Sequence, residues 1–478
     1  MKFLEAIVDF LERNIKTLFY YPGEQVLPLC EEVENSKINN ILAGDERGAG
    51  FMAEGYARIT NYIGVAISST PGAGNLVTPA LNAYKDNSSI LLITGRNYKK
   101  YRGENYFQEI DMNFLNIYKG YFDPKYEDFV KAFYECLYSR RPIHINISLD
   151  CYDKEVEVRD YIKYKYNYNF NIDIESRKPL LLIGQGIYGL MPYKDIIKIN
   201  KILKSVQIPI STTFPARGVI SENSDNCIGL VGRRGDIKSL LEADKIINIG
   251  SSLSYNTYVE SVRNELLKKT ININFYPNDI KEVKELFNNI SLDNLWFEKE
   301  LYFTPKGDYS KKIYTLISSL PDDAIIVNDA GKHTVFTCLL KKCYLPKSLI
   351  ASHSFGCMGF SLPTAIGVKL ACLDYGIDRE VVSINGDGSF IMNLQELKVI
   401  SENNLKILIV IFENHKLGRF KTINNPNFVK IAESFNIDAY KTENYEEIED
   451  VVKGYLRGNK PLLLSIKTED EDLPTPNR

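Results

Sequence analysis

A carboxylate and an amide, separated in the chain by one predicted helix and one predicted strand, could together bind a metal ion. Asp387 lies between Gly386 and Gly388, and Asn414 follows downstream. Their oxygens suit Mg2+ or Ca2+, and Mg2+ often combines one or two protein carboxylates with phosphate oxygens. The glycines let a phosphate approach the backbone. The pattern predicts a site that holds a diphosphate through a metal; a Gly-Asp-Gly turn without a ligand is the alternative.

Two apolar runs and the segment between them predict how these side chains are brought together. Residues 381–385 and 405–412 have the composition of buried strands, and residues 394–403 carry apolar side chains at helical spacing. A strand–helix–strand crossover places both strand ends at the same edge of a parallel sheet. Asp387 and Asn414 should therefore meet at the carboxyl edge, where open α/β sheets bind ligands.

The chain as a whole predicts an α/β protein with parallel sheets, because strand-like runs alternate with helical patterns from end to end. A length of 478 residues favours three domains. We place them at residues 1–165, 175–300 and 303–478, with a polar and aromatic linker at about 160–178.

Composition excludes several classes of function. The formal net charge is −3, with 58 basic and 61 acidic residues, so the sequence has no electrostatic footprint for nucleic acid. The apolar runs are too short to span a membrane, and acidic residues interrupt the layout of a signal peptide. Eight scattered cysteines without a Cys-x-x-Cys pair indicate reduced thiols, so we expect a cytoplasmic protein.

Five motifs, in family order, resemble those of thiamine-diphosphate-dependent 2-oxoacid enzymes, and the large subunit of acetolactate synthase above all. Residues 386–414 resemble the motif that binds thiamine diphosphate. The others are residues 43–58, similar to the segment with the catalytic Glu; 69–75, a Gly-rich turn; 107–109, a substrate-facing motif; and 355–363, a stretch whose Met supports the cofactor.

The resemblance implies a fold, cofactors and partners. Two thiamine-diphosphate-binding folds should flank a central Rossmann-like domain, with thiamine diphosphate and Mg2+ as cofactors. The protein should form a homodimer or a dimer of dimers, with active sites between protomers. Its substrate should be a small 2-oxoacid, which it decarboxylates with carboligation through a cofactor ylid.

The same resemblance assigns roles to individual residues. Glu46 should pass a proton to the aminopyrimidine ring, and Gln108 is the second predicted catalytic residue; the alternative for Glu46 is a structural pair with Arg47 or Arg58. Asp387, Asn414 and the backbone carbonyl of Lys416 are the predicted metal ligands. The predicted cofactor-binding residues are Gly23, Pro71, Asn75, Lys332, His333, Gly356, Met358, Gly386, Gly388, Ser389 and Leu417. Core packing is the alternative for Met358, and a surface-loop position is the alternative for His333.

The segment after Asn414 departs from the acetolactate synthase pattern. The family has a long segment there with a Trp that selects the second oxoacid, whereas this segment is short and the only Trp is Trp296. A non-carboligating decarboxylase of the sulfopyruvate or phosphonopyruvate type is therefore the alternative. Lys416, Arg419 and Lys421 would suit a second anionic group on the substrate, or form a solvated loop.

Other departures bear on cofactor and reaction. Glu24 stands where the family has a Gly, and Asp123 falls near the place of a family Lys. Residues 250–254 lack the Arg-Phe-Asp-Asp pattern that holds FAD, which predicts weak or no FAD binding. The four histidines are isolated, which counts against pyruvate decarboxylases. A non-catalytic cofactor-binding homologue and C–C hydrolysis of a cyclic dione are further interpretations; the distant Glu46 argues against the first of these.

Overall fold

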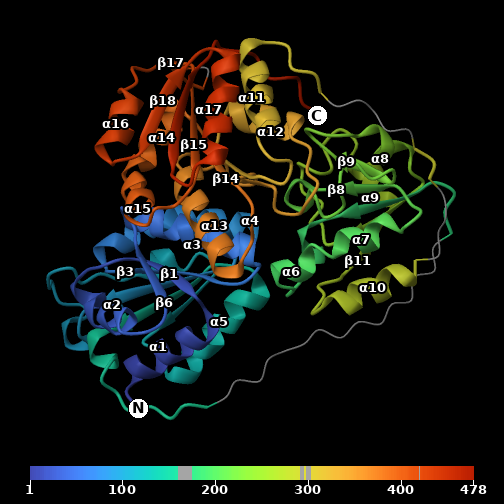
Figure 1. The fold of residues 1–478 in the computed structure, drawn as a ribbon. Helices are drawn as coiled ribbons and strands as arrows, with labels where there is room; N and C mark the ends of the chain where they lie inside the picture. The colour runs from blue at the N-terminus through green and yellow to red at the C-terminus, as the bar shows by residue number, and fades with distance from the viewer. Residues whose placement is uncertain (160–174, 291–294, 298–302, 419, 478) are drawn as a thin grey trace.

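Three parallel sheets, each covered by helices, organise the chain in the order N-terminal, central and C-terminal (Figure 1). The computed structural model describes residues 1–159, 175–290, 295–297, 303–418 and 420–477. The predicted α/β class with parallel sheets is confirmed. Part of the predicted linker, residues 160–174, lies outside the described residues, and the second sheet begins at Pro179.

The N-terminal sheet has the strand order β2-β1-β3-β4-β6-β5. Every neighbouring pair in it is parallel. Its strands are β1 (Thr17–Tyr21), β2 (Asn39–Leu42), β3 (Gly64–Ser68), β4 (Ile90–Arg96), β5 (Lys119–Phe122) and β6 (Ile143–Ser148). Its helices are α1 (Phe3–Asn14), α2 (Leu27–Glu34), α3 (Glu46–Thr60), α4 (Val77–Asp86) and α5 (Tyr126–Ser139).

The central sheet has the order β11-β10-β7-β8-β9, again with parallel neighbours. Its strands are β7 (Pro179–Ile183), β8 (Ile210–Thr212), β9 (Cys227–Leu230), β10 (Lys245–Ile249) and β11 (Thr270–Ile273). Short helices surround it: α6 (Tyr193–Ile196), α7 (Ile199–Lys204), α8 (Lys238–Glu242), α9 (Arg263–Lys268) and α10 (Ile280–Asn288).

The C-terminal sheet has the order β13-β12-β14-β15-β19-β18 and parallel neighbours. Its strands are β12 (Ile325–Asn328), β13 (Leu349–Ala351), β14 (Val381–Gly386), β15 (Leu408–Glu413), β18 (Asp438–Thr442) and β19 (Leu462–Lys467). Its helices are α11 (Asp308–Ser319), α12 (Lys332–Leu340), α13 (Ser361–Tyr375), α14 (Asp387–Phe390), α15 (Leu397–Glu402), α16 (Phe428–Ser434) and α17 (Tyr445–Arg457).

The predicted helix at 394–403 is only partly correct. The α-helix begins at Leu397, and residues Ile391–Glu396 form a 3-10 turn before it. Asn393 interrupts the helical backbone with φ −139°, and its side-chain amide donates a hydrogen bond to the carbonyl of Gly359. The local pattern could not reveal this contact with a distant loop, because it depends on tertiary packing.

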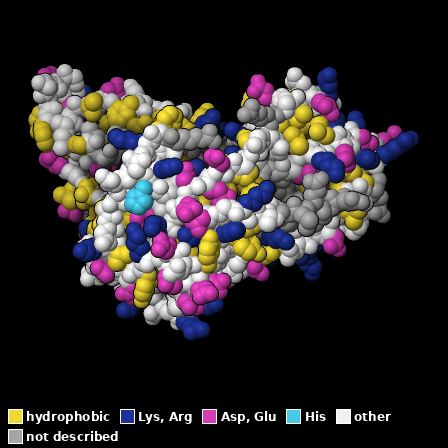
Figure 2. Space-filling view, turned by 90° about the horizontal axis from the view of Figure 1, so that it is seen from above, with side chains coloured by type: hydrophobic (Ala, Val, Ile, Leu, Met, Phe, Trp, Pro, Cys, Tyr) yellow, Lys and Arg dark blue, Asp and Glu magenta, His cyan; other side chains and the backbone are white. Residues whose placement is uncertain are grey.

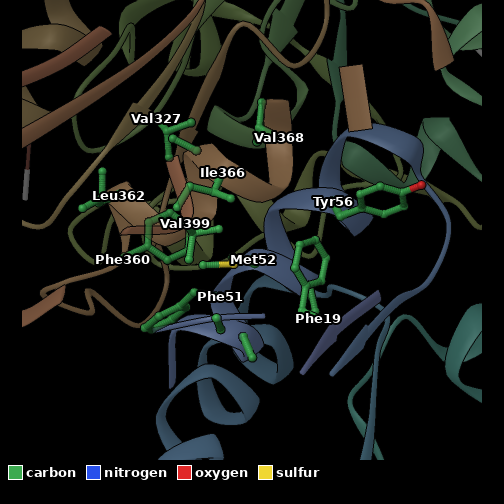
Figure 3. Packing of buried hydrophobic residues seen from close by; sticks show 14 of the residues in the cluster. Phe19, Phe51, Met52, Tyr56, Val327, Phe360, Leu362, Ile366, Val368 and Val399 are labelled. Atoms are coloured by element: carbon green, nitrogen blue, oxygen red, sulfur yellow. The ribbon is translucent and has the colours of Figure 1, made fainter. Parts of the chain in front are cut away.

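Helices α3 and α13 join the N-terminal and C-terminal domains through one shared apolar core. Figure 3 shows Phe51 and Met52 of α3 near Phe360 and Ile366. The rings of Phe51 and Phe360 meet edge to face, with centroids 5.5 Å apart. This core makes the two domains one packed unit, with the central domain beside them (Figure 1).

Glycines let the two helix backbones approach each other closely. A Cβ on Gly55 would lie 2.2 Å from the carbonyl oxygen of Thr364, and a Cβ on Gly367 would lie 1.9 Å from that of Met52. These obstacles are backbone atoms, so the helices would have to move apart to admit a methyl group.

Replacing Gly55 or Gly367 with Ala should lower the free energy of unfolding by about 1–3 kcal/mol or more, because the contact cannot relax locally. Urea unfolding of each variant measures this. Gly454→Ala is the matched control, since a Cβ at that position in α17 has nothing within 4 Å. Equal stabilities for Gly367→Ala and Gly454→Ala would contradict the close packing of α3 against α13.

Charged side chains of both signs are mixed on the face of the molecule shown in Figure 2. No helix in the described part of the chain is long and apolar enough to cross a membrane.

Candidate active site

Glu46 occupies the first position of α3, directly after β2, at the carboxyl edge of the N-terminal sheet. Asp45 caps the helix, and its side chain accepts a hydrogen bond from the backbone N–H of Gly48 at 2.7 Å. The Glu46 side chain is largely buried, and its Oε2 accepts a hydrogen bond from Asn75 Nδ2 at 2.8 Å. A Cβ on Gly72 would lie 2.1 Å from Glu46 Oε1. The Gly-rich turn Pro71–Leu76 therefore fits closely around this carboxyl group.

The alternative in which Glu46 pairs with a neighbouring arginine is wrong. Arg58 binds Glu54 and Asp86, each at 2.6 Å. Arg47 lies 3.7 Å from Asp45 and donates a hydrogen bond to the carbonyl of Met392. Among the described residues, the one side-chain hydrogen bond to the Glu46 carboxyl group comes from Asn75.

Gly23 and Gln108 lie near each other at the same edge of the N-terminal sheet. Gly23 follows β1, and a Cβ on it would lie 2.4 Å from the Cβ of Ser69, which follows β3. Gln25 is buried and donates a hydrogen bond to Gln108 Oε1 at 2.6 Å. Gln108 adopts a left-handed backbone conformation with φ 61°. The residues predicted at this end thus lie on the loops that follow β1, β2, β3 and β4.

Asp387 and Asn414 follow the neighbouring parallel strands β14 and β15. Asp387 is 2 % exposed, and its Oδ2 accepts hydrogen bonds from the backbone N–H of His415 at 2.7 Å and from Asn425 Nδ2 at 3.0 Å. Asn414 Oδ1 accepts the backbone N–H of Lys416 at 3.1 Å. The structure therefore ties Asp387 to the segment that carries the other two predicted metal ligands.

His333 lies against the glycine that precedes Asp387. It is 2 % exposed, its Nε2 lies 2.9 Å from the carbonyl oxygen of Asp329, and a Cβ on Gly386 would lie 3.3 Å from its Cε1. Burial lowers the pKa of His333 to about 4, so the imidazole is neutral near pH 7. The surface-loop alternative for His333 is wrong. Ser389 Oγ accepts the backbone N–H of Gly386 at 3.1 Å, which closes this turn.

Met358 and Leu417 meet over Gly388. A Cβ on Gly388 would lie 3.0 Å from Leu417 Cδ1 and 3.9 Å from Met358 Cε. Met358 is only partly buried, and the preceding Gly356 is exposed with φ 77°. The Met358 side chain therefore borders the Gly-Asp-Gly turn, where it can contact a ligand bound there.

Asp329 holds the loop that carries Met358, a contact that sequence analysis missed. This buried carboxylate accepts the backbone N–H groups of Gly359 at 3.0 Å and Ser361 at 2.8 Å. Burial raises the pKa of Asp329 to about 6, and these N–H groups oppose the rise. Its position directly after strand β12, like that of Asp387 after β14, was the available signal.

Two of the predicted basic residues share one acidic partner. Lys332 Nζ contacts Asp470 at 2.6 Å, and Lys416 Nζ contacts the same carboxylate at 3.0 Å. Asn414 Nδ2 also donates to Asp470, at 3.2 Å. Lys421 is exposed in a small hairpin of β16 (Lys416–Leu417) and β17 (Lys421–Thr422), and Arg419 lies outside the described residues.

Three further residues noted in the sequence have these surroundings. Glu24 is exposed and directly follows Gly23. Asp123 binds Arg102 and Lys99; although burial opposes it, hydrogen bonds from Arg102 and Ser148 lower the pKa of Asp123 to about 2. The Trp296 indole donates a hydrogen bond to the carbonyl of Pro179, at the start of the central sheet.

The donor set fits a magnesium ion that also binds a diphosphate. Among the described residues, no group of three or more His, Cys, Asp or Glu side chains is arranged to hold a metal. The predicted set has one carboxylate, one amide and one backbone carbonyl, which leaves positions for phosphate oxygens. The backbone N–H groups of Gly386 and Gly388 donate to Ser389 Oγ at 3.1 Å and to Asp387 Oδ1 at 2.8 Å, so a phosphate would have to replace these acceptors.

Three family models match the chain. They are the N-terminal TPP binding domain of thiamine pyrophosphate enzymes over residues 1–115, the central domain over 174–290, and the C-terminal TPP binding domain over 329–466. An uncharacterized protein of Methanocaldococcus jannaschii is 60 % identical over 100 % of this chain and 99 % of its own length. The chain belongs to the thiamine pyrophosphate enzyme family.

This thiamine pyrophosphate (thiamine diphosphate) enzyme is also similar to acetolactate synthase large subunits, which confirms the resemblance found in its motifs. A "Probable acetolactate synthase large subunit" of M. jannaschii is 29 % identical over 98 % of this chain and 92 % of its own length. The acetolactate synthase large subunit of Porphyra purpurea is 28 % identical, with the same coverage.

Solved structures confirm the fold of this thiamine pyrophosphate enzyme. Benzoylformate decarboxylase from Polynucleobacter necessarius superposes with a TM-score of 0.81 at 16 % identity, over 99 % of this chain and 100 % of that one. The 4-hydroxybenzoylformate decarboxylase of Rhodococcus jostii gives 0.79 at 17 % identity, with the same coverage.

A second buried carboxyl group, Glu396, lies beneath the start of α3 and was not predicted. It is 0 % exposed, and its Oε2 accepts the backbone N–H of Gly44 at 2.9 Å. A Cβ on Gly48 would lie 1.9 Å from its Oε1, which has no hydrogen-bond partner among the described residues. Burial raises the pKa of Glu396 to about 8, so the group is largely protonated at neutral pH.

Glu396 should make the protein less stable as the pH rises from about 4.5 to about 8. In that range the unfolded chain releases this proton while the folded chain keeps it, which removes up to about 1.4 kcal/mol per pH unit. Glu396→Gln should abolish this part of the pH dependence. Urea unfolding at pH 5 and pH 8 tests it, with the exposed Glu402→Gln as control. Parallel pH profiles for wild type and Glu396→Gln would contradict the protonated state.

Proposed function

We propose that this enzyme decarboxylates a 2-oxoacid and joins the product to a second oxoacid, as an acetolactate synthase does. The observation that carries the proposal is the pairing of Glu46 with Asn75 at one sheet edge, together with Asp387 at the carboxyl edge of another. The similarity to acetolactate synthase large subunits over nearly the whole chain supports it.

In this proposal the C-terminal domain holds the diphosphate end of the cofactor. Asp387, Asn414 and the Lys416 carbonyl would hold Mg2+, and the turn that carries Gly388 and Ser389 would lie beside the phosphates, with the Gly388 N–H exchanging its bond to Asp387 Oδ1 for one to a phosphate. Met358 and Leu417 support the ring system above Gly388. When bound, thiamine diphosphate supplies the carbanion chemistry. Asp329 acts through the Met358 loop, whose backbone it fixes.

The N-terminal domain supplies the group that moves a proton. Glu46 can hold a proton on the oxygen that faces the aminopyrimidine while Asn75 fixes its other oxygen. A side chain at position 72 would collide with this carboxyl group, so the glycine keeps its place free. Gln108, held by Gln25, is placed on the substrate side. Together these residues orient the reactants and exclude water.

Assembly and location belong to the same proposal. Glu46 and Asp387 stand on different sheets, so a homodimer or a dimer of dimers could pair the edge of one protomer with that of its partner. We propose a cytoplasmic enzyme that acts on a small 2-oxoacid and does not require FAD. Neither nucleic acid nor a membrane is a partner in this proposal.

A non-carboligating 2-oxoacid decarboxylase is the second candidate, favoured by the hairpin that follows Asn414. The hairpin closes with a hydrogen bond from the backbone N–H of Ile423 to the carbonyl of His415 at 2.9 Å. This hairpin is much shorter than the Trp-bearing segment with which acetolactate synthases select the second oxoacid. The exposed Lys421 and the Asp470-bound Lys416 would suit a substrate with a second anionic group.

The test is turnover by the purified protein with Mg2+ and thiamine diphosphate, with and without FAD. Release of CO2 from pyruvate with formation of acetolactate is the expected result, and it should not need FAD. CO2 with an aldehyde, from pyruvate or from sulfopyruvate, would favour the second candidate. Tight cofactor binding without CO2 from any 2-oxoacid in a broad panel would contradict both.

A further inference from the structure

The three domains meet at a small cavity that lies apart from every predicted active-site residue. Its volume is about 30 Å3, which is room for about two water molecules. The N-terminal domain contributes Arg58, Asp86 and Arg140, the central domain Gln185 and Phe214, and the C-terminal domain Lys347 and His353. A ligand bound here would touch all three domains.

The carboxylates of Glu54 and Asp86, at and beside this cavity, both form ion pairs with Arg58, each at 2.6 Å. Asp86 also accepts the backbone N–H of Ser354 at 3.0 Å. His353 lies 3.4 Å from Asp86, and burial lowers the pKa of His353, so it is neutral near pH 7. Glu54 and Asp86 are therefore paired with Arg58 and not with the other cationic side chains at the cavity.

Two other cations at the cavity have no carboxylate partner in the described part of the chain. Lys347 is only 8 % exposed, and its Nζ lies 4.3 Å from the centroid of the Tyr188 ring. Arg140 donates to the carbonyl of Gly189 at 3.2 Å and to Asn61 Oδ1 at 2.6 Å, which are neutral acceptors. Its Nε is buried without a partner.

The two cations are close enough to act on each other. Burial, followed by the charges of Arg140 and Arg58, lowers the pKa of Lys347 well below its ordinary value. Both residues also adopt the left-handed backbone conformation, with φ 52° at Arg140 and 62° at Lys347. The cavity is thus bordered by the permanent charge of Arg140 and by a lysine whose protonated form is disfavoured by burial and by that charge. A negative charge between the two would favour the protonated lysine.

We infer that this cavity binds one small monovalent anion, of the size of a halide, formate or bicarbonate, between Lys347 and Arg140. The cavity faces the ends of β7 and β8, where a Rossmann-like domain would accept a nucleotide, but its volume admits no dinucleotide. The anion would neutralise the buried cations and hold the three domains together. This inference does not depend on the proposed reaction.

Thermal unfolding of the full chain at constant ionic strength tests the inference. The buffers contain sodium chloride, bromide, formate or bicarbonate, each against sodium gluconate, whose anion is too large for the cavity. A small anion should raise the Tm of the wild type saturably, as expected for a ligand that binds only the folded state. A response to halides alone, or to formate and bicarbonate alone, identifies the chemical source.

Lys347→Met is the decisive variant. It should lose the saturable shift and, in gluconate, unfold at or above the wild-type Tm, because the buried amine beside Arg140 is gone. Lys311→Met, at an exposed position in α11, should keep the shift. An equal shift in wild type and Lys347→Met, or no shift in the wild type with any small anion, would overturn the inference.

A measurement on the wild type covers the case in which Lys347→Met does not fold. Crystals grown in sodium bromide should show an anomalous peak within hydrogen-bonding distance of Lys347 Nζ and the Arg140 guanidinium. An empty cavity in such crystals would overturn the inference.

Discussion

A Glu46→Gln variant is expected to lose about 10²- to 10⁴-fold in turnover, the usual contribution of a general acid–base group. The amide has the same size, so it still fits against Gly72, and its oxygen can still accept the hydrogen bond from Asn75. It cannot gain and release a proton at neutral pH. The expected defect is therefore in kcat and not in the affinity for thiamine diphosphate.

The measurement pairs steady-state kinetics on the best 2-oxoacid substrate with calorimetric titration of thiamine diphosphate in the presence of Mg2+. Glu31→Gln is the matched control, because Glu31 is an exposed carboxylate in α2 of the same domain and away from the loops around Glu46. Its kcat should equal that of the wild type. If Glu46→Gln kept wild-type turnover, Glu46 would not be the proton-carrying group.

An Asp387→Ala variant is expected to weaken the binding of thiamine diphosphate with Mg2+ by more than about 100-fold. Loss of groups that only orient metal ligands already costs about 10- to 100-fold, and Asp387 is proposed as a ligand itself. Its carboxylate also fixes the backbone of His415, next to the other proposed ligands. The loss of the metal ligand and the loss of the hydrogen bond to His415 both affect the site proposed for Mg2+ and the diphosphate. Neither change touches the pair formed by Glu46 and Asn75.

Titration of thiamine diphosphate at several Mg2+ concentrations measures the effect and separates it from unfolding, which the Tm monitors. Asp438→Asn is a suitable control, since Asp438 is an exposed carboxylate in the same domain. The expected result is a lost Mg2+ dependence in Asp387→Ala only. Unchanged affinity in that variant would show that the metal binds elsewhere.

The parts of the site that the sequence predicted are those encoded within short segments. The strands around Asp387 and Asn414 have buried apolar runs, and their connection fixes them as parallel neighbours. Such elements depend on local periodicity and on handedness, so they can be predicted without the fold. Glu46, by contrast, was predicted only from the family resemblance of residues 43–58, and the structure places it at the start of α3.

The parts that could not be predicted depend on contacts between distant segments. Asp329 reaches the Met358 loop, Glu396 packs beneath the start of α3, and Asp470 binds Lys332. Each of these acidic residues is one among 61 in the chain, and nothing local separates it from a solvated surface acid. Only the packed structure shows which ones are buried or tied to a lysine.

The contact between α3 and α13 has a consequence for the order in which the chain can mature during synthesis. Helix α3 is made early, but the surface that covers its Phe51 and Met52 comes from α13, which begins only at Ser361. A nascent N-terminal domain must therefore expose an apolar face until α13 has been synthesised. We expect that face to be a chaperone-binding surface on the ribosome-bound chain, and residues 1–159 expressed alone to aggregate.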